Sequence, residues 1–211
     1  MTLDIIQLMT HVQDREYDET DHRILDAALE ENAAQGVGNL SLERVAKRAR
    51  MNRATIYRRF GNREGLQGAL AVREGKQMAR ELRDAVEDIE DTDTVFIEGF
   101  VAAIRFAREH PVIARTAQYE PGELIMIGRV NNSALLQVGA SFMANTIRWA
   151  QEKGRALHLD ADSAGDLAAR MFAAFVLIPG GYNQLTNDEA ARDFAKKTFV
   201  PMFLGNSLSA E

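Results

Sequence analysis

Residues 41–66 read SLERVAKRARMNRATIYRRFGNREGL and decide the fold. Ser41 is a good N-cap, and Asn52 is another eleven residues later. Behind Ser41 the apolar residues fall on one narrow helical stripe, made of Leu42, Val45, Ala46 and Ala49. Behind Asn52, Ile56 and Phe60 lie one turn apart and face inward. The stretch therefore predicts two short helices joined by a turn of about three residues, the first ending near residue 49 and the second near residue 59.

The chain on both sides of this pair is also predicted to be helical. Thr20 or Asp21 is a good N-cap, and apolar residues recur at helical spacing as far as Gly36. This pattern predicts a helix over residues 21–35. Later helices are predicted near 63–87, 93–109, 111–118, 123–153, 162–181 and 188–204, separated by Gly, Pro or Asn. Because no alternating strand pattern of useful length appears, we expect an all-α fold of about nine helices.

Charge is distributed unevenly along the sequence. Residues 41–73 contain nine Lys and Arg residues against two Glu residues, a local charge of +7. The whole chain carries −6, so the remainder carries −13. A basic segment on an acidic protein attracts a polyanion, while the remainder limits nonspecific binding. This distribution favours nucleic acid as a partner of residues 41–73.

Two short helices backed by a longer one have the layout of a helix-turn-helix DNA reader. With Ile56 pointing inward and 100° per residue, Ala54, Tyr57 and Arg58 point outward, and Thr55 lies at the outward edge. Arg53 and Arg59 lie nearer the buried side in this projection. Their long stems can still carry a guanidinium to a phosphate or to guanine N7 and O6.

The stretch ILDAALEENAAQGVGNLSLERVAKRARMNRATIYRRFGNREGL resembles the N-terminal signature of TetR-family regulators over roughly residues 22–70. In that family the residues that match Arg53, Ala54, Thr55 and Tyr57 approach the major groove, and those that match Ser41, Arg59 and Arg63 hold phosphates. The candidate base contacts are Arg53, Ala54, Tyr57 and Arg58, and the candidate phosphate contacts are Ser41, Thr55, Arg59 and Arg63. Two residues depart from the pattern, because Arg50 and Ala54 stand where glycine is common. Arg50 is therefore expected to adopt a positive φ at some strain.

The resemblance implies that a larger helical domain, residues 71–211, follows an N-terminal arm (1–20) and the DNA-binding domain (21–70). It also implies that the larger domain binds a small molecule and forms a homodimer. Apolar stripes on its helices supply the candidate pocket residues Phe96, Phe100, Ile104, Met126, Phe142, Met143, Trp149 and Phe175. The segment 167–178 is apolar on nearly every side, which favours packing against a second subunit. With the last helix it supplies the candidate dimer-interface residues Ala168, Phe172, Ala173, Val176, Phe194, Phe199, Met202 and Phe203.

Several classes of function lack support in the sequence. There is no cysteine, and the four histidines are scattered at spacings that suit neither a metal site nor a catalytic dyad. We expect no cofactor, no metal and no enzyme activity. No leader and no run of 18 apolar residues is present, so we expect a cytoplasmic protein without a membrane partner.

The expected function is that of a repressor, which binds an inverted-repeat operator in double-stranded DNA as a dimer and is released by a small, largely apolar effector. Three alternatives stay open at this point: a transcriptional activator, a regulator controlled by a protein partner, and a helical ligand carrier that binds no operator. Sequence preference on duplex DNA separates the carrier from the regulators.

Overall fold

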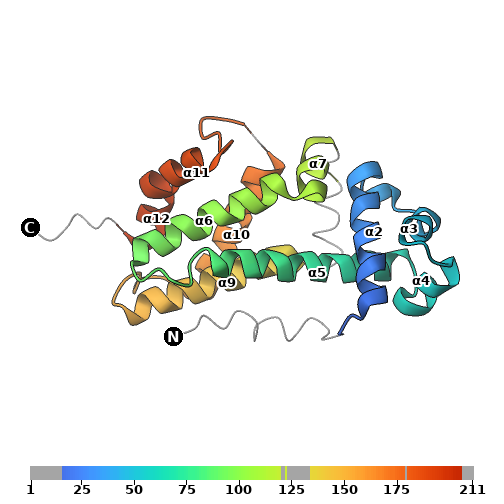
Figure 1. The fold of residues 1–211 in the computed structure, drawn as a ribbon. Helices are drawn as coiled ribbons and strands as arrows, with labels where there is room; N and C mark the ends of the chain where they lie inside the picture. Colours follow the sequence, from blue (N-terminus) through green and yellow to red (C-terminus); the bar gives the residue numbers. More distant parts are fainter. Residues whose placement is uncertain (1–15, 120–121, 123–133, 179, 206–211) are drawn as a thin grey trace, which may run out of the picture. The chain divides into compact units, whose positions relative to one another are not determined.

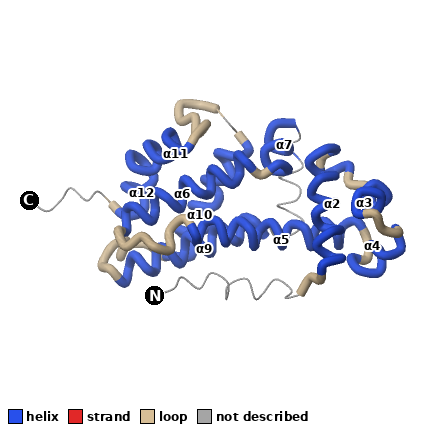
Figure 2. The backbone as a smooth tube through the Cα atoms, viewed as in Figure 1, coloured by secondary structure: helices blue, strands red, loops and turns tan. Residues whose placement is uncertain are grey.

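The computed structural model describes residues 16–119, 122, 134–178 and 180–205. In these ranges the regular elements are helices, with no strand (Figure 2). They are α2 (Glu19–Gln35), the 3-10 helix η2 (Val37–Asn39), α3 (Leu42–Ala49), α4 (Arg53–Phe60), α5 (Arg63–Asp84), α6 (Thr92–Glu109), α7 (Pro111–Tyr119), α9 (Ala134–Glu152), α10 (Ala161–Leu177), α11 (Asp188–Phe194), the π-helical η3 (Ala195–Phe199) and α12 (Val200–Leu204) (Figure 1). When α11, η3 and α12 are counted as one continuous helix, the described ranges hold nine α-helices, which confirms the predicted fold class.

The described chain divides into two compact units. Of the described residues, the N-terminal unit comprises 16–76, 110–119, 122 and 134–135, and the C-terminal unit comprises 77–109, 136–178 and 180–205. The boundary between the units falls within α5, between Lys76 and Gln77. It lies six residues beyond the boundary after residue 70 that the sequence predicts. The N-terminal unit also includes α7, which packs against α2 although it follows it by more than 70 residues.

The core of the N-terminal unit is built from one apolar face of each of its first four helices. Its fully buried side chains are Ile24 and Leu25 of α2, Val45 of α3, Ile56 of α4 and Leu66 of α5. Burying a side chain of this size stabilises the fold by about 1.5–3 kcal/mol. The inward direction predicted for Ile56 is confirmed, and it fixes which face of α4 is left for solvent.

Helix α2 begins two residues earlier than the sequence analysis suggests. Asp18 is its N-cap, because one carboxylate oxygen of Asp18 accepts the backbone N–H of Asp21 at 2.8 Å. The Asp21 carboxylate in turn accepts the N–H of Asp18 at 3.3 Å, which completes a capping box. The predicted start at Thr20 or Asp21 was therefore wrong, and Asp21 is the third residue of the helix. Of the predicted arm, residues 1–15 lie outside the described residues.

A polar cluster links α2, α5 and the start of α7 within the N-terminal unit. Arg73 contacts Asp26 at 2.6 Å and Glu74 at 2.7 Å, and His110 Nε2 lies 3.1 Å from the second Glu74 oxygen. Burial by itself raises the pKa of Glu74, but the hydrogen bonds to His110 and Arg73 outweigh it and lower that pKa below its usual value. The Glu74 carboxylate of α5 therefore stays charged and links α5 to His110, directly before α7.

An aromatic cluster forms the centre of the C-terminal unit. Phe100 of α6 lies 4.7 Å from Phe199 and 5.4 Å from Phe194, measured between ring centroids. Phe203 of α12 continues the cluster at 4.8 Å from Phe199. Because η3 is π-helical, one extra residue is accommodated between α11 and α12, and all three of these rings point into the same core.

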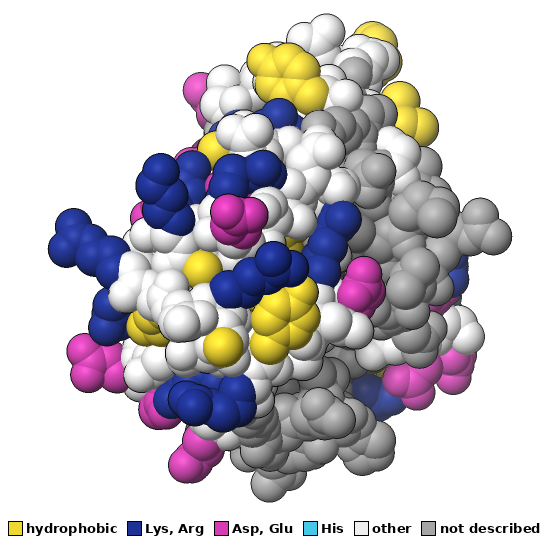
Figure 3. Space-filling view, turned by 90° about the vertical axis from the view of Figure 1, so that its right-hand side faces the viewer, with side chains coloured by type: hydrophobic (Ala, Val, Ile, Leu, Met, Phe, Trp, Pro, Cys, Tyr) yellow, Lys and Arg dark blue, Asp and Glu magenta, His cyan; other side chains and the backbone are white. Residues whose placement is uncertain are grey.

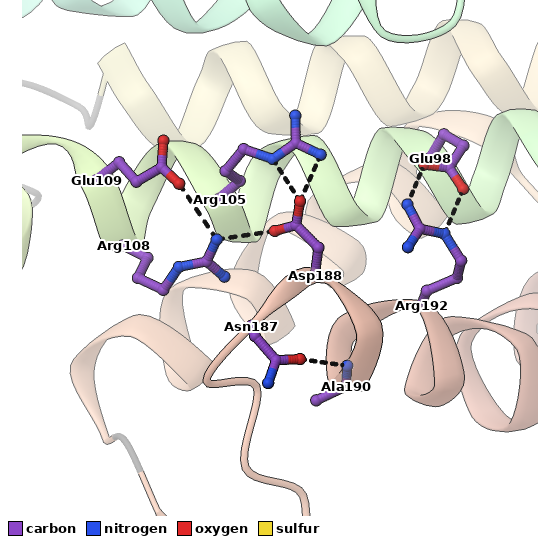
Figure 4. Close-up of polar contacts among 8 residues, drawn as sticks. All are labelled: Glu98, Arg105, Arg108, Glu109, Asn187, Asp188, Ala190 and Arg192. Carbon is purple, nitrogen blue, oxygen red and sulfur yellow. Dashed lines mark hydrogen bonds and ion pairs between the residues drawn. The ribbon is translucent and has the colours of Figure 1, made fainter.

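Ion pairs fasten α11 to α6 at the surface of the C-terminal unit (Figure 4). Arg108 and Arg105 each donate to one oxygen of Asp188 at 2.8 Å, and Arg192 donates two hydrogen bonds of 2.7 Å to Glu98. These bonds hold the pKa of Asp188 and that of Glu98 below their usual values, with Arg108 the largest cause for Asp188 and Arg192 for Glu98. Asn187 caps α11 by accepting the N–H of Ala190 at 2.8 Å.

Candidate nucleic-acid interface

Helices α3 and α4 are joined by a turn over residues 50–52 and form a helix-turn-helix. The turn ends at Asn52, whose side chain accepts the N–H of Ala54 at 2.9 Å and caps α4. On α4 the side chains of Arg53, Ala54, Tyr57 and Arg58 are exposed, and Thr55 is half-buried. The four predicted base contacts thus share one solvent-facing side of α4, with Thr55 at its edge.

Arg53 and Tyr57 are paired on this exposed side. Arg53 Nη2 donates a hydrogen bond of 2.8 Å to the Tyr57 hydroxyl, and the guanidinium carbon lies 5.2 Å from the centre of the Tyr57 ring. The hydrogen bond also raises the pKa of Arg53. A guanidinium held in this way has lost part of its rotamer freedom before it meets a partner, and its fork suits guanine O6 and N7.

Both arginines of α3, Arg44 and Arg48, form ion pairs with α2. Glu31 of α2 is buried, with 1% of its side chain exposed, and it accepts a short hydrogen bond from Arg44 and one of 3.0 Å from Arg48. This carboxylate is not among the functional residues predicted from the sequence. A signal was present, because Glu31 lies seven residues after Ile24 and so falls on the buried stripe of α2, opposite a basic helix. Two of the nine basic residues therefore brace α3 against α2.

Two of the predicted phosphate contacts also have partners within the N-terminal unit. Arg59 lies 2.7 Å from Asp18 and 3.0 Å from Asp21, and this pairing lowers the pKa of Asp18. Arg63 donates hydrogen bonds to the backbone carbonyls of Val37 and Gly38. Both guanidiniums thus hold η2 or the start of α2 in place. Their contact with phosphates stays a prediction, and it requires that they share these bonds with DNA.

The cations that remain lie around the turn and on α4. Lys47, Arg50 and Arg58 are exposed and make no ion pair with any described residue. With Arg53 they give the helix-turn-helix a set of unneutralised charges. Figure 3, which looks onto this end of the molecule, shows Lys and Arg side chains gathered on it among fewer Asp and Glu side chains. Ser41 caps α3 through its Oγ, which accepts the Arg44 N–H at 3.4 Å, so its hydroxyl lies at the N-terminus of a helix, where a phosphate is favoured.

An α-helix with an exposed polar face, small at Ala54 and cationic on both sides of it, has the size and charge that fit the major groove of DNA. Comparison with known proteins agrees with this geometry. Residues 24–70 match the family described as bacterial regulatory proteins, tetR family. These residues are a tetR-family helix-turn-helix domain.

Sequence relatives match the chain over its N-terminal part. An uncharacterized HTH-type transcriptional regulator of Mycobacterium tuberculosis is 30% identical over 92 residues, which is 44% of this chain and 46% of that protein. The HTH-type transcriptional regulator SrpR of Pseudomonas putida is 45% identical over 60 residues, 28% of each chain. The chain thus spans about half or less of the length of these curated relatives.

Similarity in fold to solved structures extends beyond the tetR-family domain. The crystal structure of the fatty acid degradation regulator FadR from Bacillus halodurans aligns with a TM-score of 0.66, at 17% identity, over 87% of this chain and 98% of that one. At this identity the match shows a shared fold and no more.

The C-terminal unit contains an apolar cavity of about 50 Å³. It is lined by Met78, Leu82, Val95, Phe96, Gly99, Phe100, Ala103, Gly139, Phe142, Met143, Thr146, Ala168, Ala169, Phe172 and Phe199. Four predicted pocket residues, Phe96, Phe100, Phe142 and Met143, are among them. Ile104 and Phe175 instead belong to the adjoining core, Trp149 lines a separate open groove where it stacks under Lys153 at 4.1 Å, and Met126 lies outside the described residues.

The predicted dimer interface needs a correction. Ala168, Phe194, Phe199 and Phe203 are buried in the C-terminal unit itself, so they leave no surface for a partner. They turn inward because the apolar period of a helix identifies a buried face without saying what covers it. Phe172, Ala173 and Val176 of α10 are partly exposed, and Leu167, Ile178 and Met202 are 50%, 77% and 50% exposed. The C-terminal unit thus keeps exposed apolar side chains along α10 and α12.

The described residues contain no group of three or more His, Asp or Glu side chains arranged to hold a metal ion. None of the helices in the described ranges is long and apolar enough to cross a membrane.

Proposed function

We propose that the chain is a DNA-binding transcriptional regulator, a repressor that binds its operator as a homodimer and releases it when a small apolar ligand binds. The observation that carries the proposal is the exposed side of α4, where Arg53, Tyr57 and Arg58 surround the small Ala54. Within the described residues, its side chains make no hydrogen bond or ion pair outside α4, and exposed cations without an ion pair, Lys47 and Arg50, lie nearby. Its place within a tetR-family domain supports the same conclusion.

Two subunits would present their α4 helices to successive major grooves, about 34–36 Å apart. The operator is then an inverted repeat, because a two-fold dimer reads the same half-site twice. The surface along α10 and α12 supports a dimer. Leu167, Ile178 and Met202 together expose apolar area that a second copy of the same surface would bury.

The cavity supports an uncharged ligand. Its only polar lining group is the Thr146 hydroxyl, which already donates to the Phe142 carbonyl at 2.9 Å, so no polar atom in the cavity needs a partner. About 50 Å³ is far below the roughly 300–1,000 Å³ of ordinary ligand sites. A ligand therefore binds an expanded conformation better than this one, and that difference in affinity is what shifts an equilibrium.

The coupling would pass through α5. Met78 and Leu82 of this helix line the cavity, and its first residues belong to the tetR-family domain. Expansion of the cavity would displace Met78 and Leu82 and tilt the helix, which would change the spacing of the two α4 helices and weaken binding to both half-sites together.

Selection of bound duplexes from a random pool at physiological salt tests the proposal. We expect enrichment of one inverted repeat, and loss of that enrichment with a variant carrying Arg53→Ala and Tyr57→Ala. The matched control carries Arg148→Ala, which removes an exposed arginine of the C-terminal unit and should select the same repeat. Recovery of random sequences by the wild-type protein would reject the operator and leave only a helical ligand carrier.

A further inference from the structure

Arg50 has an unusual backbone conformation in the turn of the helix-turn-helix. It is the C-cap of α3, with φ 53° and ψ 47°, in the left-handed region. Its N–H donates to the Lys47 carbonyl at 3.2 Å, and the next N–H, of Met51, donates to the Ala46 carbonyl at 2.9 Å. These bonds end α3 in the manner for which glycine is preferred, because a Cβ is strained at this φ. The positive φ predicted from the sequence is confirmed.

The fold gains nothing visible from the Arg50 side chain. Ala156, the one other non-glycine residue with a positive φ in the described ranges, is 5% exposed and packs in the core of the C-terminal unit. Arg50, in contrast, is exposed and makes no hydrogen bond or ion pair through its side chain with any described residue. A strained residue whose side chain makes no hydrogen bond or ion pair with the described part of its own fold points to a role outside the fold.

The surroundings of Arg50 indicate what that role is. Lys47 lies three residues before it and Arg53 three residues after it, and all three are exposed. Directly after the turn, α4 begins, and the backbone N–H groups at the start of a helix favour an anion. The nearby arginines of α3 are both paired with Glu31, which leaves Arg50 as the unpaired guanidinium of the turn among the described residues.

We propose that Arg50 binds a backbone phosphate of DNA next to the groove that α4 enters. The planar guanidinium suits a phosphate because it donates two parallel hydrogen bonds. This assignment rests on the proposed function. It implies that Arg50 lowers the stability of the fold and raises the affinity for DNA. Replacing Arg50 should therefore increase stability and decrease affinity.

The test compares the wild-type protein with Arg50→Gly and Arg50→Lys. Fluorescence anisotropy gives the affinity for the selected operator and for a scrambled duplex over a range of salt, and thermal unfolding gives the Tm. Arg50→Gly should weaken binding to both duplexes about fivefold and lower the magnitude of the slope of log K against log salt by about 1.8, the value for two phosphates, one for each subunit of the dimer. The same variant should unfold about 2 °C higher, since the strain is removed. Arg50→Lys should keep the slope.

The outcomes separate this assignment from the proposed function. A wild-type protein that prefers no duplex overturns both. A wild-type protein that binds its operator, with an Arg50→Gly variant of equal affinity and slope, overturns only the role of Arg50. A loss confined to the operator would indicate a base contact and also overturns the phosphate assignment. Lys197→Ala, which removes an exposed charge of the C-terminal unit, is the control and should change neither affinity nor slope.

Discussion

At the scale of single residues, the arginines of the basic segment divide into two groups by what surrounds them. Arg44, Arg48, Arg59 and Arg63 are held by acidic side chains or backbone carbonyls of the N-terminal unit. Arg50 and Arg58 have no such partner among the described residues. In the sequence the nine basic residues of 41–73 cannot be told apart by role, because charge alone does not reveal which of them faces a buried carboxylate.

The buried carboxylate gives the first prediction. Glu31→Gln removes the charge that Arg44 and Arg48 share, and it should lower the free energy of unfolding by about 2 kcal/mol. Glu30→Gln is the matched control, since Glu30 is adjacent and 66% exposed, and it should change stability by less than about 0.5 kcal/mol. Urea unfolding at neutral pH measures both. Equal effects of the two changes would contradict the structural role of Glu31.

The Arg53–Tyr57 pair gives the second prediction. Tyr57→Phe keeps the ring but removes the hydroxyl that accepts from Arg53, so operator affinity should fall by about 1 kcal/mol. The fall should vanish in an Arg53→Ala background, because the hydroxyl then has nothing to position. A double-mutant cycle of operator affinities measures this coupling. Additive effects of the two changes would mean that Tyr57 acts on DNA independently of Arg53.

At the scale of elements, helices α9 and α10 are in unusually close contact. A Cβ placed on Gly165 of α10 would lie 2.4 Å from the carbonyl oxygen of Ala140 and 3.0 Å from the Cβ of Ala144. Gly139 of α9 is different, because a Cβ there would lie 3.7 Å from Ala169, an ordinary contact. The same substitution should therefore act in opposite directions at the two glycines.

Gly165→Ala should destabilise the protein by about 1–3 kcal/mol, since the helices must move apart. Gly139→Ala should be neutral or stabilise by up to about 1 kcal/mol, because alanine is the better helix former. Thermal or urea unfolding of the two variants, side by side, checks the contrast. A stabilising Gly165→Ala would show that the two helices are not packed as described.

The ion pairs between α6 and α11 make stability depend on pH. The pKa of Asp188 is lowered in the folded state, first by Arg108 and then by Arg105, so its contribution is full above the unfolded pKa of about 4. It is lost as the pH falls through the folded value. Asp188→Asn should cost about 1 kcal/mol at pH 7 and little at pH 2, since the groups are about one-third exposed. Asp193→Asn on the same helix, where Asp193 is 58% exposed, should leave the acid limb unchanged when unfolding is followed against pH.

The sequence predicts best those features that depend on residues close together in the chain. Ser41 and Asn52 mark their helices because capping depends on residues three or fewer apart. The start of α2 was misplaced by two residues because Asp18 and Asp21 are both good caps and only the reciprocal bond chooses between them. The grouping of α7 with the N-terminal helices depends on contacts across more than 70 residues, which no local pattern encodes. That Trp149 lines a groove with residues 83–95 also depends on contacts between distant parts of the sequence.

At the scale of the whole molecule, the surface along α10 and α12 is the proposed dimer interface. Leu167→Glu places a charge on this surface and should give a monomer in light scattering, with operator affinity reduced at least tenfold because only one half-site is held. Leu157→Glu is the control, since Leu157 is 71% exposed in the connection between α9 and α10 and belongs to neither α10 nor α12. A Leu167→Glu dimer would place the interface elsewhere.

The internal pairing of Arg44, Arg48, Arg59 and Arg63 also affects how such a protein would search a genome. Arginines whose charge is partly balanced by Glu31, Asp18 or Asp21 release few counterions on arbitrary DNA, so the dwell time on nonspecific sites should be short. The search would then proceed mainly by dissociation and rebinding in three dimensions, with brief sliding. A larger fraction of the protein would be free at any moment than the charge of the basic segment suggests, and occupancy of the true operator would respond quickly to the ligand.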